Sequence, residues 1–431
     1  MSQRVRVAIT GIGLVTPVGN DRESTWQGLL AGRTGAGPIT TFDASGFSTR
    51  IGAEVKGFDF EKVANRRLLK LASRSHRFAL GAAEEALADA GIRPESATAE
   101  RWGISVGAGM MAVTLEELGV VHRHCCSPDG ELQVERMAAR DYPGDPVSFC
   151  RTQSNTGLSL LMHHFGIRGY ATAVHTACAS GGQAIGTGLK VMRRGQADAM
   201  LVGGFDSMLN PIGLSSFCLL GALSADNDEP WRASRPFDVS RNGFVLGEGA
   251  GFLVIERWEA AVARGAHIYA ELAGDGNSLS CYRITDSPPD GDGPIQAIQQ
   301  SMRDAGIKPE DVDYVNAHGT STQMNDQSEC AALKGVMGEH LPNVSVSSTK
   351  GCMGHLIAAA GAVEAAVCAL AIRDGMAPVS ANFQTPDSGS TVNIIAGQSR
   401  PLRIRAAISN SLGFGGSNSC LTFRNPSFVQ A

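Results

Sequence analysis

One cysteine of this chain lies where nucleophilic chemistry is possible. Cys178 belongs to the segment Thr176-Ala-Cys-Ala-Ser-Gly-Gly182, between a strand-like run and a helix of small residues. Unpaired N–H groups at the start of a helix favour a thiolate, and small neighbours let a substrate approach the sulfur. Most cysteines are small buried apolar residues, as the nine others here illustrate. Cys178 is therefore a candidate nucleophile that needs partners to act.

Two histidines occupy similar glycine-flanked positions. His318 lies in Asn316-Ala-His-Gly-Thr320, directly after a strand-like run, and His355 ends the segment Lys350-Gly-Cys-Met-Gly-His355. A lone histidine is more often structural than catalytic. Two histidines and one cysteine, each at the end of a strand, fit nucleophilic catalysis better than they fit packing alone. The pattern predicts one site made of Cys178, His318 and His355.

A third glycine-rich loop surrounds an aromatic residue. In Asn410-Ser-Leu-Gly-Phe-Gly-Gly-Ser-Asn418, three glycines flank Phe414. Such an open backbone can aim N–H groups at a ligand, as an oxyanion hole does, with a movable ring beside them. A tight turn between two strands is the alternative. Beside a candidate cysteine and two histidines, the oxyanion hole is the better interpretation.

The segments that must position these loops occur in two copies. Residues 89–95 (Asp-Ala-Gly-Ile-Arg-Pro-Glu) recur at 304–310 (Asp-Ala-Gly-Ile-Lys-Pro-Glu), each between a helical stretch and a strand-like run. Compositional likeness of alanine-rich helices is the alternative, but the matching flanks favour duplication. We predict two α/β halves, residues 1–260 with the cysteine and residues 261–431 with both histidines. Residues 116–146 have no counterpart and form a helical and loop-like insertion.

Composition supports a layered α/β protein. The 431 residues include 52 glycines and 18 prolines but only 6% aromatics, which suits α/β layers better than an aromatic-rich sandwich. A net charge of −5 leaves no basic footprint for nucleic acid. Residues 356–372 contain Glu364, which we interpret as a satisfied buried carboxylate, and are too short for a membrane span. Ten cysteines without a CxxC pair or export signal indicate reduced thiols and a cytoplasmic location.

These motifs together resemble those of the β-ketoacyl-acyl-carrier-protein synthases, the chain-elongating condensing enzymes with a Cys-His-His triad. The likeness extends along the whole chain and includes residues 10–17, 235–238, 243–251 and 413–416. The resemblance implies an α/β, thiolase-like, five-layered αβαβα fold with two pseudo-duplicated halves. It also implies decarboxylative condensation of malonyl-carrier protein with an acyl group on Cys178, and hence an acyltransferase acting in fatty acid elongation.

The resemblance further assigns individual roles. No metal and no cofactor is expected, because substrates arrive on the phosphopantetheine arm of an acyl carrier protein, and the adjacent Cys125 and Cys126 of the insertion lack zinc-ligand spacing. The resemblance makes Cys178 the nucleophile, with His318, His355 and Lys350 as its catalytic partners and Asp326 and Glu329 in a charged network that supports the histidines. It makes the backbone N–H groups of Cys178 and Phe414 the oxyanion hole, with Phe414 also acting as gate. Thr320 and Thr322 are the implied pantetheine contacts, and Met110 is the implied residue that limits acyl length.

Departures from the family pattern keep other functions open. Leu412 replaces a frequent phenylalanine, and Gly351-Cys352-Met353 replaces the usual Ser-Met-Thr, so the malonyl pocket is expected to differ in shape. A ketosynthase subunit of a polyketide or polyene pathway is the nearest alternative. A thiolase would need a second catalytic cysteine, and Cys420 lies outside the gate loop. A non-enzymatic carrier-binding partner is the remaining class.

A basic cluster is the expected docking site for the acidic carrier protein. Arg66, Lys70, Arg74 and Arg77 recur at helical spacing with Arg67 alongside, which predicts one charged face of a helix. A merely solvated face is the alternative. The family also implies a homodimer, or a heterodimer with a chain-length-factor homologue.

Overall fold

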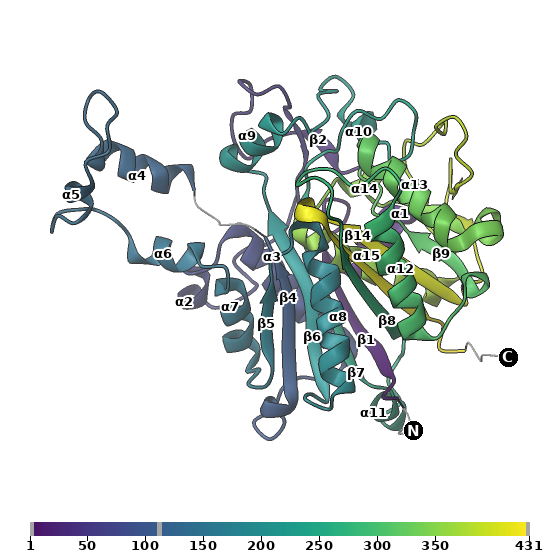
Figure 1. The fold of residues 1–431 in the computed structure, drawn as a ribbon. Coiled ribbons are helices and arrows are strands. Elements are labelled where there is room, and N and C mark those ends of the chain that lie inside the picture. The colour runs from purple at the N-terminus through teal and green to yellow at the C-terminus, as the bar shows by residue number, and fades with distance from the viewer. Residues whose placement is uncertain (1–3, 110–113, 428–431) are drawn as a thin grey trace.

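A run of hydrogen-bonded strands crosses the molecule (Figure 1). The computed structural model describes residues 4–109 and 114–427, and its largest sheet has the order β12-β10-β9-β14-β15-β8-β1-β7-β6-β4-β5. The strands of the first half of the chain are β1 (Val7–Val15), β4 (Trp102–Ala108), β5 (Ala171–Val174), β6 (Ala199–Ser207) and β7 (Glu248–Arg257). Those of the second half are β8 (Ala270–Leu279), β9 (Val312–Asn316), β10 (Ser345–Ser347), β12 (Asn393–Ile394), β14 (Ala406–Leu412) and β15 (Ser417–Arg424).

The two sides of this sheet repeat one pattern outward from the junction of β1 and β8. On one side β1, β7 and β6 are antiparallel neighbours, and β4 and β5 follow in parallel. On the other side β8, β15 and β14 are antiparallel, and β9 and β10 follow in parallel. The predicted duplication is therefore present in the topology. The boundary itself, at residue 260, stays a prediction.

Helices separate the two half-sheets and cover their outer faces. The middle layer consists of α8 (Ser180–Arg193) and α15 (Ala360–Asp374), which contact each other and strands of both halves. The outer layers contain α3 (Arg74–Ala90), α7 (Thr156–Phe165), α12 (Asp292–Ala305) and α13 (Gln323–Met337). Apart from α4 to α6, which form the insertion described below, the other α-helices of the described residues are α1 (Arg22–Leu30), α2 (Arg66–Leu69), α9 (Pro211–Leu219), α10 (Pro230–Ala233), α11 (Trp258–Ala263) and α14 (Lys350–Met353). Two small sheets pair β2 (Ala36–Pro38) with β3 (Ile51–Ala53) and β11 (Met376–Ala377) with β13 (Arg400–Pro401). The layers follow the expected αβαβα order.

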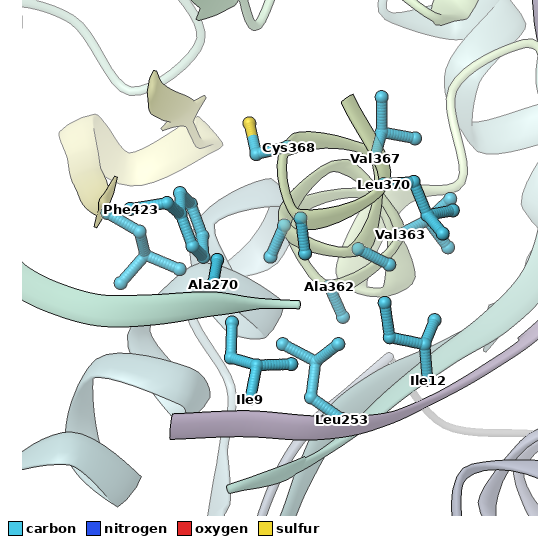
Figure 2. Close-up of a cluster of buried hydrophobic side chains, with 14 of the residues drawn as sticks. Ile9, Ile12, Leu253, Ala270, Ala362, Val363, Val367, Cys368, Leu370 and Phe423 are labelled. Carbon is cyan, nitrogen blue, oxygen red and sulfur yellow. The ribbon is translucent and has the colours of Figure 1, made fainter. Parts of the chain in front are cut away.

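Small side chains let the middle helices sit deep between the sheets. Residues 360–372 of α15 are all buried. Figure 2 shows Ala362 and Val363 of this helix beside Ile12 of β1 and Leu253 of β7, within one apolar cluster. A helix that is apolar on every side belongs in a core, so the buried-helix interpretation of this segment is confirmed. Among the described residues, no helix is long and apolar enough to cross a membrane.

Glycine pairs bring one outer helix of each half, α3 and α12, directly onto the first strand of that half. A Cβ at Gly13 of β1 would lie 1.9 Å from the Ala82 carbonyl oxygen of α3, and one at Gly276 of β8 would lie 2.0 Å from the Ala297 oxygen of α12. Such separations exclude any side chain. The Gly-x-Gly of residues 11–13 therefore serves helix packing, and its counterpart at residues 274–276 repeats this in the second half.

The predicted insertion forms an arm at the β5 edge of the sheet (Figure 1). This arm, residues 114–152, contains α4 (Leu115–Cys125), α5 (Val134–Met137) and α6 (Pro146–Thr152). Its helical and loop-like character is confirmed. Several large apolar side chains of the arm are exposed, namely those of Leu115, Leu118, Leu132, Val134, Met137 and Phe149.

Candidate active site

Three loops bring the predicted reactive side chains to one point. Cys178 lies in the short turn Ala177–Ala179 that opens α8, His318 follows β9, and His355 precedes the turn Ile357–Ala359 that opens α15. The Nε2 atom of His355 is 3.0 Å from the Cys178 sulfur, and the two imidazole centroids are 5.2 Å apart. All three side chains are at most 4% exposed. The structure thus unites the three residues in a buried cluster.

The turns that open α8 and α15 share an unusual backbone. Ala177 has a φ of 49° and Ile357 a φ of 47°, each at the first residue of its turn. Left-handed backbone costs a non-glycine residue about 1–2 kcal/mol and is rare for a β-branched one. The matching strain shows that these turns are equivalent in the duplicated halves. This equivalence places Ala358 at the position that corresponds to Cys178.

Hydrogen bonds set the tautomer of both histidines. The Nδ1 atom of His355 accepts from the Ile357 N–H at 3.2 Å, and the Nδ1 atom of His318 lies 3.4 Å from the Lys350 ammonium. A backbone N–H and an ammonium can only donate, so each Nδ1 is unprotonated and each neutral ring carries its proton on Nε2. Burial, followed by the Lys350 charge, holds the pKa of both histidines well below the ordinary 6.5. Both are therefore neutral hydrogen-bond donors.

Burial also governs the cysteine. Desolvation raises the pKa of the Cys178 thiol to about 12, with a smaller raising effect from Asp206, against the lowering effects of Lys350 and of the Phe414 and Cys178 N–H groups. The helix start favours the thiolate as the sequence predicted, but desolvation outweighs this effect and the resting thiol is protonated. The two N–H groups nevertheless face the sulfur, as an oxyanion hole requires.

Lys350 is held by Glu364, the carboxylate that the sequence predicted to be buried and satisfied. Its ammonium donates to the His318 carbonyl at 2.6 Å and pairs with Glu364 of α15, where both side chains are only 1% exposed. Glu364 is therefore a member of the charged network that the predicted list of Asp326 and Glu329 did not include. Lys350 and Glu364 lie fourteen residues apart, and helix packing alone brings them together.

Glu329 and Asp326 instead hold the backbone of the His318 loop. Glu329 accepts from the N–H groups of His318 and Gly319, both at 2.8 Å, and Asp326 accepts from the Thr320 N–H at 2.9 Å. Burial raises the pKa of Glu329 to about 7. The two carboxylates therefore support His318 through its main chain and not through the charge of Lys350.

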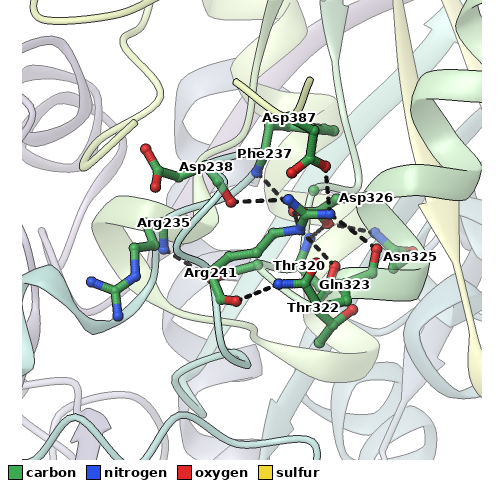
Figure 3. Close-up of polar contacts among 12 residues, drawn as sticks. Arg235, Phe237, Asp238, Arg241, Thr320, Thr322, Gln323, Asn325, Asp326 and Asp387 are labelled. Carbon is green, nitrogen blue, oxygen red and sulfur yellow. Dashed lines mark hydrogen bonds and ion pairs between the residues drawn. The ribbon is translucent and has the colours of Figure 1, made fainter. Parts of the chain in front are cut away.

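A buried arginine that the sequence analysis missed secures the same loop (Figure 3). Arg241, 3% exposed, donates to the Thr322 carbonyl at 3.2 Å and to the Asp238 carbonyl at 2.9 Å. It also pairs with Asp387 at 2.8 Å and with Asp326 at 3.5 Å. A cation this deep needs such partners. The sequence feature that could have identified Arg241 is its position within residues 235–251, a stretch that contains two of the family motifs.

The cluster lies in a cavity of about 330 Å³. Met110 lies outside the described residues, so its predicted role as limit of acyl length stays a prediction. Its lining includes Cys178, His318, His355, Thr320, Thr322, Leu412 and Phe414, together with the exposed side chains of Leu220 and Ile284.

The departures from the family pattern have separate consequences. Leu412 lines the cavity, whereas residues 351–353 are buried in α14 and do not line it. A Cβ at Gly351 would lie 2.5 Å from the Ala381 oxygen, so packing requires glycine there. The expectation that residues 351–353 reshape the pocket is wrong. Cys420 is buried in the core of the second half and is not among the residues that line the cavity.

The basic cluster is not one helical face. Lys70 caps α2, and α3 begins at Arg74 after the capping residue Ser73, so the chain turns between the two groups. Arg74 pairs with the buried Glu248, and Arg77 pairs with Glu61. The single-helix prediction is therefore wrong, because the serine cap starts a new helix. Arg66, Arg67 and Lys70 remain exposed.

The sulfur and two imidazoles are also close enough to share a metal ion. One ligand atom from each of Cys178, His318 and His355 lies within 4.8 Å of the others. The Lys350 ammonium, 3.4 Å from His318, opposes a second cation at that point. The absence of a metal from the working site stays a prediction.

A buried cysteine with two neutral histidine donors, placed where two duplicated halves meet, defines a thiol-dependent condensing enzyme of the thiolase fold. The chain matches the family models "Beta-ketoacyl synthase, N-terminal domain" over residues 4–261 and "Beta-ketoacyl synthase, C-terminal domain" over residues 269–384. This protein belongs to the β-ketoacyl synthase family, whose members are condensing acyltransferases.

Named relatives are similar in sequence to this chain over nearly its full length. The chain is 39% identical to a 3-oxoacyl-[acyl-carrier-protein] synthase 2 of Synechocystis over 422 residues, 98% of each chain, and 38% identical to that of Staphylococcus aureus over 424 residues, 98% of this chain and 99% of the other. A β-ketoacyl synthase structure from Burkholderia phymatum has a TM-score of 0.87 at 30% identity, covering 98% and 99%. A type II polyketide ketosynthase in complex with its acyl-carrier protein has a TM-score of 0.86 at 31% identity, with the same coverage. The predicted thiolase-like fold is confirmed.

The Lys350–Glu364 pair generates a stability prediction. We expect Lys350→Met to lower the free energy of unfolding by about 3–5 kcal/mol, because it leaves a carboxylate buried without a partner. The double variant Lys350→Met/Glu364→Leu should recover much of that loss. Urea unfolding of the wild type, the single variant and the double variant measures the three free energies of unfolding. Arg232→Met, which breaks the exposed pair with Glu229, is the control and should cost at most about 1 kcal/mol. A double variant no more stable than the single one would contradict the pairing.

The histidine environment generates a pH prediction. Because the pKa of both His318 and His355 is lowered, both rings should stay neutral with Nε2 protonated from pH 8 down to about 6. ¹⁵N NMR of the imidazole nitrogens reports this directly, with His318→Asn and His355→Asn variants for assignment. The unfolded chain takes up these protons near pH 6.5 and the native protein does not, so these residues lower stability as the pH falls below that value. Protonation of either ring at pH 7 would contradict the tautomer assignment.

Proposed function

We propose that this enzyme extends acyl chains held on an acyl carrier protein by decarboxylative condensation with malonyl-carrier protein, as in fatty acid elongation. The observation that carries the proposal is the 3.0 Å approach of the Cys178 sulfur to a histidine whose Nε2 is a donor, with a second such donor beside it. The reaction needs no cofactor, because the carrier's pantetheine arm brings both substrates.

In the first half-reaction Cys178 takes the acyl group. Its sulfur bonds to the thioester carbon, the bond to the pantetheine sulfur breaks, and the thiol proton passes overall to the departing pantetheine. The negative oxygen formed on the way accepts from the N–H groups of Cys178 and Phe414, which already face the sulfur. His355 donates to the same sulfur and so favours its charged form.

In the second half-reaction the histidines act on the malonyl thioester. The Nε2–H groups of His318 and His355 donate to its carbonyl oxygen while the carboxylate leaves as CO₂ and an enolate forms. Neutral imidazoles suit this step because they donate a hydrogen bond without neutralising the departing carboxylate. The enolate carbon then attacks the acyl-Cys178 carbonyl and forms the new carbon–carbon bond. The Cys178 sulfur leaves as a thiolate, which takes up a proton from solvent to restore the resting thiol.

The pantetheine arm lies along the loop after His318 in this proposal. Thr320 and Thr322 line the cavity, and their hydroxyls are 2.8 Å apart, within reach of the amides of the arm. Arg241 and Asp326 hold this loop from behind. Exposed Arg66, Arg67 and Lys70 provide positive charge that attracts an acidic carrier protein.

A polyketide pathway is the second candidate. The solved ishigamide ketosynthase/chain length factor is 33% identical to this chain with a TM-score of 0.86, and Leu412 alters the cavity wall. Against this, the fatty-acid-type relatives reach 39% identity. Fatty acid elongation is the better supported function, and the masses of products made from malonyl-carrier protein and a panel of acyl carriers distinguish the two.

Substitutions at the three reactive residues test the mechanism. Cys178→Ala should abolish the acyl adduct that mass spectrometry detects after incubation with acyl-carrier protein. His318→Asn and His355→Asn should still load some acyl group, but CO₂ release from malonyl-carrier protein should fall on the order of 10²- to 10³-fold, because each loses one donor to a developing oxyanion. Cys150→Ala and His163→Asn, at exposed sites, are matched controls. An adduct that persists in Cys178→Ala would overturn the role of the nucleophile.

We also propose that two copies of this chain associate through the arm and the β5 edge. Within the described residues β5 pairs only with β4 and ends the sheet, and an unpaired strand edge favours pairing with another chain. The arm, which carries exposed apolar residues, projects from the side of the molecule where β5 lies (Figure 1). Sedimentation of the purified chain should give a dimer, and Val134→Glu/Phe149→Glu should give a monomer. A wild-type monomer would support association with a different subunit instead.

A further inference from the structure

We infer that Asp206 is the positioning residue of His355, because its carboxylate holds the turn Ile357–Ala359 in the conformation that fixes the His355 ring. The kinetic part of this inference rests on the proposed function, whereas the placement of the ring does not.

Asp206 is a buried carboxylate that the proposed mechanism does not use. It lies near the end of β6, is 3% exposed and is not among the residues that line the cavity. Its Oδ2 accepts from the Ala358 N–H at 3.0 Å, and its Oδ1 accepts from the Ser207 N–H at 2.8 Å. Burial raises the pKa of Asp206 to about 7, against the lowering effect of these two bonds. The protein thus keeps a carboxylate, which is costly to bury, against the turn that follows His355.

The turn that Asp206 contacts sets the orientation of the His355 ring. Ile357 has the left-handed backbone described above, and its N–H donates to the His355 Nδ1 at 3.2 Å. A β-branched residue keeps such a conformation where its surroundings require it. Asp206 binds the next N–H along the chain, that of Ala358, from outside the turn. The carboxylate therefore holds the Ile357 N–H where it can fix the tautomer of His355.

The equivalent turn of the first half shows the alternative use of the same N–H group. In both turns the last N–H donates to the carbonyl just before the turn, at 3.1 Å in the first half and 3.0 Å in the second. The middle N–H groups differ, because that of Cys178 faces the reactive sulfur and that of Ala358 is bound by Asp206. The Asp206 carboxylate thus occupies, in the second half, the place that a negative oxygen takes in the first half during acyl transfer.

A glycine beside Asp206 leaves room for its carboxylate. A Cβ at Gly109 would lie 2.2 Å from the Oδ1 atom of Asp206 and 2.4 Å from the Oδ2 atom. A side chain at residue 109 would therefore displace the carboxylate and leave its charge unchanged. This gives a second way to test the role of Asp206, from a different segment of the chain.

The first test replaces the carboxylate by an amide of nearly the same shape. An amide has one acceptor oxygen, so Asp206→Asn cannot accept from both Ala358 and Ser207. We expect ¹⁵N NMR at pH 8 to show that the His355 ring of this variant loses its single tautomer. The His318 ring, whose Nδ1 faces a different donor, should keep its tautomer.

A second variant and a matched control accompany this measurement. Gly109→Ala should change the His355 signals in the same way as Asp206→Asn. Asp275→Asn removes another buried carboxylate, whose side chain is 1% exposed, pairs with Lys190 at 2.5 Å and does not line the cavity, so it should leave the His355 signals unchanged. Unchanged His355 signals in Asp206→Asn or in Gly109→Ala would overturn the inference, and so would an equal change in Asp275→Asn.

The two half-reactions separate positioning from general damage. In Asp206→Asn the kcat of CO₂ release from malonyl-carrier protein should fall roughly tenfold to a hundredfold with KM unchanged, because a small misplacement of a reacting group costs about that much. Acyl loading of Cys178 should fall less, because Asp206 adds to the raising effect of burial on the pKa of that thiol, and removal of its charge favours the thiolate. Equal losses in both half-reactions would contradict the positioning role. A wild-type protein that releases no CO₂ would refute the proposed function, whereas the NMR signals judge Asp206 alone.

Discussion

The two central helices meet backbone to backbone at their first turns, and the rest of the site depends on that contact. A Cβ at Gly361 of α15 would lie 2.7 Å from the nitrogen of Gly182 in α8. Because no side chain separates the helix starts, Cys178 and His355, which flank them, come within 3.0 Å of each other. The buried layer of small residues therefore serves catalysis as well as packing.

Such close packing also removes water, and the electrostatics of the site follow from that. Desolvation keeps His318 and His355 neutral and makes the resting Cys178 thiol weakly acidic. The buried Lys350 charge then needs Glu364 beside it. Burial thus keeps the Cys178 thiol and both imidazoles neutral, and the substrates bring the charge that the donors stabilise.

Duplication explains why one site combines a nucleophile with two hydrogen-bond donors from equivalent places in the fold. The equivalent turns with left-handed Ala177 and Ile357 open α8 and α15, yet the first turn carries the nucleophile and the second carries Ala358 at the same position. The second half contributes the histidine donors from its own strand ends. The two halves thus contribute different groups to one cavity: the first half contributes the nucleophile and the second half contributes the hydrogen-bond donors.

The sequence by itself determined the three reactive residues, the duplicated halves and the insertion, because glycine-flanked strand ends and repeated segments are local patterns. Only the tertiary structure decided what surrounds them. It paired Lys350 with Glu364 and not Glu329, revealed Arg241 behind the threonine loop, and split the basic cluster into two helices. These contacts join residues far apart in the chain or depend on a single capping serine. Which partner a buried charge meets, and how far burial shifts its pKa, depends on packing that no local pattern encodes.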